Sequence, residues 1–106
     1  MALRAPVSFE FYPPKTDEQR AQLDRSVQRL KAHAPQFMSV TFGAGGSTLS
    51  HTPETVQRLR SEHGVAGVPH ITCVGGSREE IRSLLKLYRA LGCDRVVALR
   101  GDTPSG

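Results

Sequence analysis

Four short apolar runs alternate with three longer amphipathic segments along the 106-residue chain. The apolar runs span residues 7–13, 37–43, 68–74 and 95–102 and contain many aromatic and β-branched side chains. In the segments between them, apolar residues recur every three or four positions, which is the spacing of one face of an α-helix. Strands that alternate with helices at these distances predict right-handed crossovers and a parallel sheet.

Each predicted helix carries a start signal that supports this alternation. A hydroxyl residue that precedes an amphipathic segment can accept a hydrogen bond from the free N–H groups of the first turn. Proline suits the first helical position, because the N–H that it lacks has no partner inside the helix. The start signals are Thr16 with Gln19, Thr52 as N-cap followed by Pro53, and Ser77 with Glu80. Gly64 and Gly92 are the expected stops of the second and third helices.

Polar and apolar residues alternate within the strands, and this pattern favours a barrel over an open doubly wound sheet. Strands that are covered on both faces read as nearly continuous apolar runs, whereas here every second position is polar. The polar set is Ser8, Glu10, Ser39, Thr41, His70, Thr72, Arg100 and Asp102. The apolar set is Val7, Phe9, Phe11, Met38, Val40, Phe42, Ile71, Cys73, Val97 and Leu99. We predict that helices cover the apolar set and that the polar set lines a shared interior.

Glu10 is the first candidate for chemistry, because it lies in the first apolar run between Phe9 and Phe11. An unpaired carboxylate is costly to bury among aromatic rings, so we expect the pKa of Glu10 to be raised. A glutamate that keeps its proton near neutral pH can serve as a general acid. The alternative is a structural pair of Glu10 with Arg100 or His70 across the interior.

His70 and a glycine-rich loop are further candidates. A histidine in an apolar strand is either a hydrogen-bonded core residue or a ligand-binding side chain, and the sequence leaves both open. No other histidine or cysteine stands at metal-ligand spacing from His70, so we predict no metal site. The loop from Gly43 to Gly46 directly follows the second apolar run. Its glycines allow the backbone to come close to a bulky partner.

Composition narrows the class of protein. A content of 38% hydrophobic and 23% charged residues is typical of a globular protein. No apolar run approaches the roughly 20 residues of a membrane helix, and the N-terminus lacks the apolar segment of a secretory signal. We therefore expect a cytoplasmic protein. Cys73 and Cys93 stand in apolar contexts, and we interpret both as buried structural thiols.

The net charge of +4 raises the question of an acidic partner. Basic residues are mixed with acidic ones in the helical segments, as in residues 78–89. Aromatic platforms and a continuous basic stripe, which nucleic-acid surfaces usually show, are missing from the sequence. We predict a solvated helix surface and no nucleic-acid partner.

Four blocks of sequence resemble one enzyme family. They read SFEFYPPKT (residues 8–16), SVTFGAGGST (39–48), PHITCV (69–74) and ALRGD (98–102). In this order and at these distances, they closely resemble the N-terminal half of bacterial methylenetetrahydrofolate reductases. The resemblance covers essentially the whole chain. It implies that residues 1–106 form the first four strands and three helices of a TIM-type (β/α)₈ barrel, with no second domain.

The resemblance also implies a reaction in one-carbon and methionine metabolism. Members reduce 5,10-methylenetetrahydrofolate to 5-methyltetrahydrofolate, and hydride passes from NADH or NADPH to FAD and then to the folate in a ping-pong cycle. Glu10 corresponds to the acid that helps to open the five-membered ring of the folate. Cofactor contacts are implied for Thr41, His70, Arg100, Gly101 and Asp102. Thr41 and Asp102 are also expected to approach the substrate.

The partners implied are a small-molecule folate, no membrane, and further copies of the chain in a homo-oligomer. Because the family barrel has eight strands, we expect a partial sequence whose activity in isolation is weak or absent. Two other functions stay open. One is a barrel aldolase or lyase that uses Glu10 and His70 without flavin, and the other is a non-catalytic half-barrel that assembles with itself or a partner.

Overall fold

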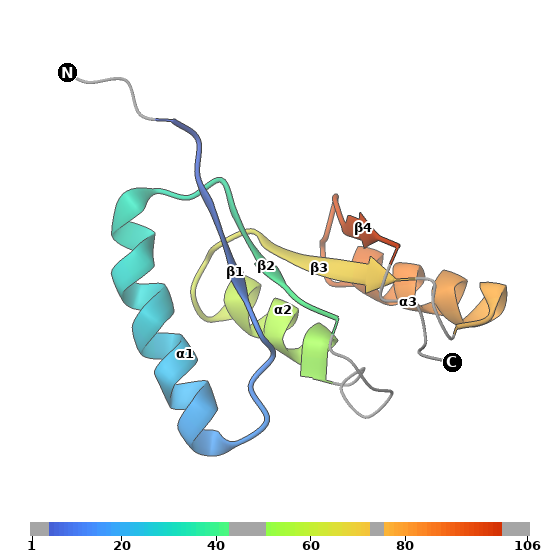
Figure 1. The fold of residues 1–106 in the computed structure, drawn as a ribbon, viewed down its shortest axis with the longest axis horizontal. Helices are drawn as coiled ribbons and strands as arrows, with labels where there is room; N and C mark the ends of the chain where they lie inside the picture. The colour runs from blue at the N-terminus through green and yellow to red at the C-terminus, as the bar shows by residue number, and fades with distance from the viewer. Residues whose placement is uncertain (1–4, 43–50, 73–75, 101–106) are drawn as a thin grey trace.

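Strands and α-helices alternate in the computed structural model, which describes residues 5–42, 51–72 and 76–100 (Figure 1). The elements in chain order are β1 (Ser8–Phe11), α1 (Asp17–Leu30), β2 (Phe37–Val40), α2 (His51–Ser61), β3 (Gly67–Thr72), α3 (Arg78–Ala90) and β4 (Val97–Leu99). A short 3-10 turn, Lys31–His33, follows α1. All the predicted strands and helices are therefore found in the described residues, and each strand is shorter than its apolar run.

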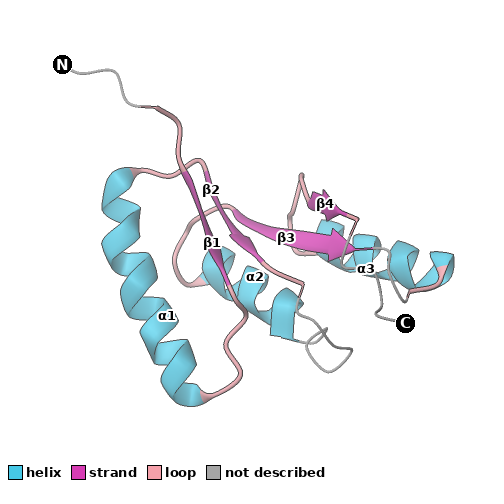
Figure 2. Cartoon of the chain, viewed as in Figure 1, coloured by secondary structure: helices cyan, strands magenta, loops and turns pink. Residues whose placement is uncertain are grey.

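The four strands form one parallel sheet in the order β1-β2-β3-β4. Strands that follow one another in sequence are thus neighbours in space, and Figure 2 shows the helices that connect them. A doubly wound sheet would reverse its strand order partway, whereas a (β/α)₈ barrel adds each strand next to the last. The prediction of an α/β fold made of parallel TIM-type units is confirmed.

One face of this sheet carries the hydrophobic core. The register pairs Phe9 with Met38 and Phe11 with Val40, so these side chains share a face. Side chains from α1, α2 and α3 pack against it. The buried core consists of Leu23, Val27, Met38, Val40, Val56, Leu59, Ile71 and Tyr88. Because all three helices contribute to this one cluster, they lie on the same side of the sheet, and the opposite face carries the polar positions of β1 and β2.

The predicted caps of α1 and α3 are confirmed. The Thr16 hydroxyl accepts a hydrogen bond from the Gln19 N–H at 3.1 Å, and the Ser77 hydroxyl accepts one from the Glu80 N–H at 3.1 Å. Gln19 reaches back as a capping-box residue does, but its side-chain oxygen accepts from the Lys15 N–H, one residue before the cap. These bonds satisfy donors that the first helical turns leave open.

The second helix begins earlier than predicted. The helical segment α2 starts at His51, so Thr52 lies inside the first turn, and its prediction as the N-cap is wrong. Its hydroxyl donates a hydrogen bond to the carbonyl oxygen of Thr41 at the end of β2. The predicted stops are confirmed, because Gly64 and Gly92 have φ angles of 65° and 93°, a backbone conformation that residues other than glycine rarely adopt.

The last strand, β4, does not follow the predicted division into a polar face and a helix-covered apolar face. Its register pairs Val97 with His70 and Leu99 with Thr72, while Ala98 pairs with Ile71. Val97 and Leu99 therefore lie on the polar face, and their assignment to the helix-covered set is wrong. The error has a simple cause, since β4 is only three residues long and its alternation offers too few positions to fix the face.

Candidate functional site

Polar side chains from three strands lie on the face of the sheet opposite the core. Glu10 pairs with Ser39 in the β1–β2 register. Val40 pairs with Pro69 in the β2–β3 register, so the next residues along, Thr41 and His70, lie beside each other. The prediction that these polar positions share one face is confirmed. Thr41 follows the carboxyl end of β2, which is the end of the strands where (β/α)₈ barrels place their sites.

His70 is buried, and neither of its ring nitrogens has a hydrogen-bond partner among the described residues. Its Nε2 lies 3.4 Å from Oε1 of Glu10, but the two atoms do not form a hydrogen bond. A buried polar atom without a partner costs on the order of 1–3 kcal/mol. An imidazole left in this state is therefore a candidate to contact a ligand.

Thr41 repeats this pattern. Its side-chain Oγ1 is buried without a hydrogen-bond partner among the described residues. Its main chain, in contrast, is bonded on both sides: the Thr41 N–H donates to the carbonyl of Phe11 at 2.9 Å, and the Thr41 carbonyl accepts from Thr52 Oγ1 at 2.9 Å. The backbone is fixed while the hydroxyl stays available.

The expected burial of Glu10 is wrong. Its side chain is 62% exposed, because β1 is an edge strand of the described sheet and the face that carries Glu10 is not the one that the helices cover. Phe9 and Phe11 are neighbours in sequence only. Successive side chains of a strand point to opposite faces, so the two rings lie on the core side and do not desolvate the carboxyl.

Of the remaining predicted site residues, Arg100 is the one that the structure describes. Arg100 is exposed, and its carbonyl accepts a hydrogen bond from Thr72 Oγ1 at 3.3 Å. Among the described residues, Glu10 lies 3.4 Å from His70, and no ion pair joins Glu10 to Arg100. Gly101, Asp102 and the Gly43 to Gly46 loop lie outside the described residues.

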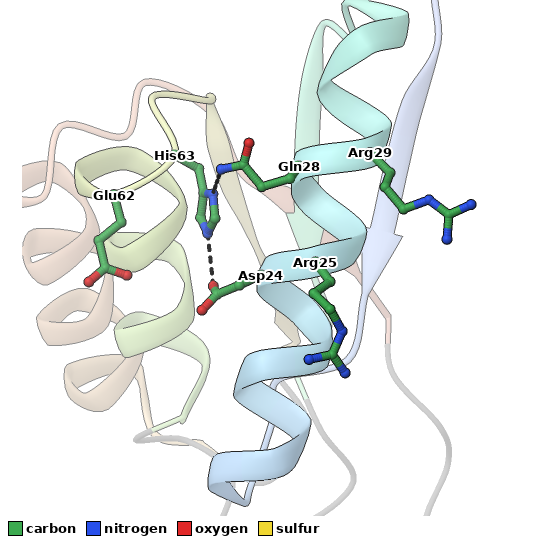
Figure 3. A pocket seen from close by; sticks show the side chains of 6 residues that line it. All are labelled: Asp24, Arg25, Gln28, Arg29, Glu62 and His63. Atoms are coloured by element: carbon green, nitrogen blue, oxygen red, sulfur yellow. Dashed lines mark hydrogen bonds and ion pairs between the residues drawn. The ribbon is translucent and has the colours of Figure 1, made fainter.

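A second polar cluster, which the sequence analysis missed, lies between α1 and α2 (Figure 3). His63 is buried, and its Nε2 lies 2.8 Å from Oδ1 of Asp24. Because a carboxylate can only accept, Nε2 carries the proton, and Nδ1 accepts from the Gln28 amide at 3.3 Å. Asp24 and Gln28 are four residues apart on α1, which is the spacing of one helix face.

Arg58 completes this cluster and makes it a structural clamp. Its guanidinium donates to both oxygens of Asp24 and lies 3.0 Å from Oε2 of Glu62. Hydrogen bonds from Arg58, and secondarily from His63, lower the pKa of Asp24 to about 2. The side-chain oxygens and nitrogen of Asp24, Glu62 and His63 are close enough to consider a metal ion. A guanidinium already bridges the two carboxylates, so the cation position is filled by the protein itself.

Of the two cysteines, Cys93 lies within the described residues. Cys93 is free and half-buried, and its thiol donates to the carbonyl of Gly67 at 3.7 Å. Burial raises the pKa of the Cys93 thiol, which fits the predicted structural role. Cys73 lies outside the described residues. No helix within the described residues has the length and apolar character needed to cross a membrane.

Comparison with known proteins gives one consistent match. Residues 2–106 match the family model described as "Methylenetetrahydrofolate reductase". The 5,10-methylenetetrahydrofolate reductases of Salmonella typhimurium and Escherichia coli are 39% and 38% identical over 100 residues, which is 94% of this chain and 34% of each relative. "Methylenetetrahydrofolate reductase (NADH) 1" of Zea mays is 40% identical over 97% of this chain and 17% of its own length. The chain thus spans about a third of the bacterial relatives.

Proposed function

Because the chain belongs to the methylenetetrahydrofolate reductase family, we propose that it contributes to a site that reduces 5,10-methylenetetrahydrofolate to 5-methyltetrahydrofolate. The proposed reductant is NADH or NADPH, and the maize relative is named for NADH. The proposed cofactor is FAD, which when bound would accept hydride from the nicotinamide and pass it on to the folate.

The observation that carries this proposal is the pair of unsatisfied polar side chains, Thr41 and His70. These two residues lie beside each other on the face opposite the core. Their side-chain polar atoms are buried without hydrogen-bond partners in the described part of the chain. A flavin offers many carbonyl, hydroxyl and ring-nitrogen atoms that can pair with a hydroxyl and an imidazole. These residues therefore fit such a cofactor, and we propose that they hold it together with Arg100, Gly101 and Asp102.

Glu10 is the proposed acid of the folate half-reaction. Its carboxyl would donate a proton to a nitrogen of the five-membered ring, so that the ring opens and its methylene carbon becomes able to accept hydride. The His70 imidazole, 3.4 Å away, can stabilise the carboxylate that remains. The 62% exposure of Glu10 in the described structure leaves room for a substrate to reach it. Thr41 and Asp102 would complete the folate contacts.

The test is the substitution Glu10→Gln in a flavin-loaded enzyme of the bacterial relatives' full length that contains this chain, with the two half-reactions measured separately by flavin absorbance. An amide keeps the shape of the carboxyl but cannot donate its proton as an acid. Flavin reduction by the nicotinamide should stay within about twofold of the unsubstituted protein. Reoxidation by 5,10-methylenetetrahydrofolate should fall by roughly 10²- to 10⁴-fold, the usual contribution of a general acid.

A matched control is Glu79→Gln, which neutralises an exposed carboxylate in the first turn of α3. Both half-reactions should be unchanged in this variant. Equal loss of both half-reactions in Glu10→Gln would assign Glu10 to flavin binding rather than to acid catalysis. Folate reduction without any flavin absorbance would contradict the proposed cofactor.

We also propose that the chain acts in the cytoplasm as part of a homo-oligomer. Apolar side chains exposed on α3 and around β4 support self-assembly, and they are Leu85, Leu87, Val96 and Leu99. The same observation favours a second candidate function, a non-catalytic half-barrel that assembles with a second copy. Sedimentation at several protein concentrations, with and without FAD, distinguishes the two, because only the catalytic form also binds flavin in a fixed ratio.

A further inference from the structure

The hydroxyl of Thr52 connects the second helix to the site. Thr52 lies in the first turn of α2 and is only 1% exposed. Its Oγ1 donates a hydrogen bond to the carbonyl oxygen of Thr41, eleven residues earlier in the chain, at 2.9 Å. In Figure 1 the N-terminal end of α2 lies below the carboxyl end of β2, where Thr41 follows the strand. The side chain of Thr52, which belongs to α2, thus holds the backbone of Thr41, which lies on the polar face of the sheet.

The geometry points to Thr52 as a positioning residue for Thr41, an inference that rests on the proposed function of this site. The Thr41 N–H is held by the Phe11 carbonyl of β1, and its carbonyl is held by Thr52 of α2. With its N–H and its carbonyl held by different elements, the backbone of Thr41 is fixed, which confines its Oγ1 to the staggered positions about a fixed Cα–Cβ bond. That oxygen is buried and unpaired in the described structure. The bond from Thr52 therefore fixes in advance the backbone that carries this hydroxyl, which we assign to the cofactor and the folate.

This bond is not an ordinary feature of a helix start. An N-cap hydroxyl accepts a hydrogen bond from an N–H of its own helix. The Thr52 hydroxyl instead donates, and its partner belongs to another element. Thr55, one turn later on α2, shows the ordinary alternative: it is 3% exposed, and its Oγ1 donates to the carbonyl of His51 within the helix at 2.7 Å. The two threonines match in burial and in bond type and differ in whether the bond reaches the site.

The experiment compares Thr52→Val, Thr52→Ser and Thr55→Val in the purified protein. Valine keeps the shape of threonine and removes the hydroxyl, while serine keeps the hydroxyl and removes a methyl group. The first readout needs no cofactor: the hydrogen-exchange rate of the Thr41 amide, measured by NMR. We expect this rate to rise at least tenfold in Thr52→Val and to stay within twofold of the unsubstituted protein in Thr52→Ser and Thr55→Val.

The second readout is the dissociation constant for FAD from a fluorescence titration. We expect about tenfold weaker binding in Thr52→Val, recovery to within threefold in Thr52→Ser, and no change in Thr55→Val. Equal Thr41 exchange rates in Thr52→Val and Thr55→Val would overturn the inference, because Thr52 would then act only on helix stability. If the unsubstituted protein bound no FAD, the proposed function would fail, while the exchange rates would still decide whether Thr52 positions Thr41.

Discussion

Arg58 of α2 donates to both carboxylate oxygens of Asp24 on α1, with Nε 3.0 Å from Oδ1 and Nη2 2.5 Å from Oδ2. A planar guanidinium matches a carboxylate in this two-pronged arrangement better than a lysine would. His63 adds a hydrogen bond to the same carboxylate. The clamp joins two helices that cover the same face of the sheet, and Asp24 is its central residue.

Substitution of Asp24 by Asn is expected to lower the free energy of unfolding by about 1–3 kcal/mol. The amide keeps the shape of the carboxyl but removes the charge that Arg58 and buried His63 both face. The measurement is urea unfolding of the purified protein followed by circular dichroism. Asp17→Asn is the matched control, because Asp17 pairs with Arg20 on the same helix but its side chain is 95% exposed. A change below about 0.5 kcal/mol is expected there, and equal losses in the two variants would contradict the clamp.

The same carboxylate makes stability depend on pH in acid. The pKa of Asp24 is about 2 in the folded protein, below its ordinary value of 3.8. A lowered folded pKa means that the unfolded chain binds the proton first, so Asp24 stabilises the fold above pH 4 and this contribution is lost as the pH falls from about 4 to 2. The loss is on the order of 2 kcal/mol.

Unfolding free energies measured at pH 6, 4, 3 and 2 for the unsubstituted protein and Asp24→Asn check this expectation. The difference between the two proteins should shrink as the pH falls toward 2, because protonation removes the charge that the substitution removes. Other carboxylates affect both proteins alike and cancel in the comparison. A difference that stays constant from pH 6 to pH 2 would show that Asp24 does not titrate in this range.

Removal of the Tyr88 hydroxyl on α3 is expected to leave stability unchanged or to increase it, in contrast to the loss expected for Asp24→Asn. It is 1% exposed, and its hydroxyl has no hydrogen-bond partner among the described residues. Burial raises the pKa of Tyr88, so the phenol stays protonated. Because an unpaired buried hydroxyl is unfavourable, Tyr88→Phe should leave the unfolding free energy unchanged or raise it by up to about 1 kcal/mol.

Tyr88→Ala is the comparison that shows the ring itself is needed. Removal of a buried aromatic side chain should cost about 3–5 kcal/mol, because it leaves a cavity against the core. Thermal and urea unfolding of both variants measure the two effects. A loss of more than about 1 kcal/mol in Tyr88→Phe would mean that the hydroxyl has a partner outside the described residues.

The sequence predicted the elements and most of the site face, because these depend on short-range patterns. Periodic apolar residues and the hydroxyls of Thr16 and Ser77 determine where α1 and α3 begin. The exposure of Glu10 could not be predicted in this way. It depends on which face of the sheet the rings of Phe9 and Phe11 occupy, and not on how near these residues are in the sequence. The bond from Thr52 to Thr41 and the pairing of Asp24 with Arg58 join residues 11 and 34 positions apart. Such partners are chosen by the packing of α2 on the sheet and on α1, which no local pattern encodes.

Gly67 at the start of β3 lies where a side chain has no room. A Cβ added there would stand 2.9 Å from the backbone carbonyl oxygen of Val56 and 3.2 Å from Cβ of Leu59. Both contacts belong to α2, and a helix carbonyl cannot turn aside as the end of a flexible side chain can. Gly67→Ala should therefore push α2 away from β3 and lower the unfolding free energy by about 1–3 kcal/mol.

Comparison with Gly64→Ala distinguishes the effect of crowding at Gly67 from the effect of backbone strain. Gly64 has a φ of 65° with nothing within 4 Å of an added Cβ, so alanine there costs only the left-handed conformation, about 1–2 kcal/mol. Because α2 also carries Thr52, displacement of the helix in Gly67→Ala should increase hydrogen exchange at the Thr41 amide, whereas Gly64→Ala should not. Urea unfolding and amide exchange on the two variants test both expectations. Full stability in Gly67→Ala would show that α2 does not lie as close to β3 as these distances require.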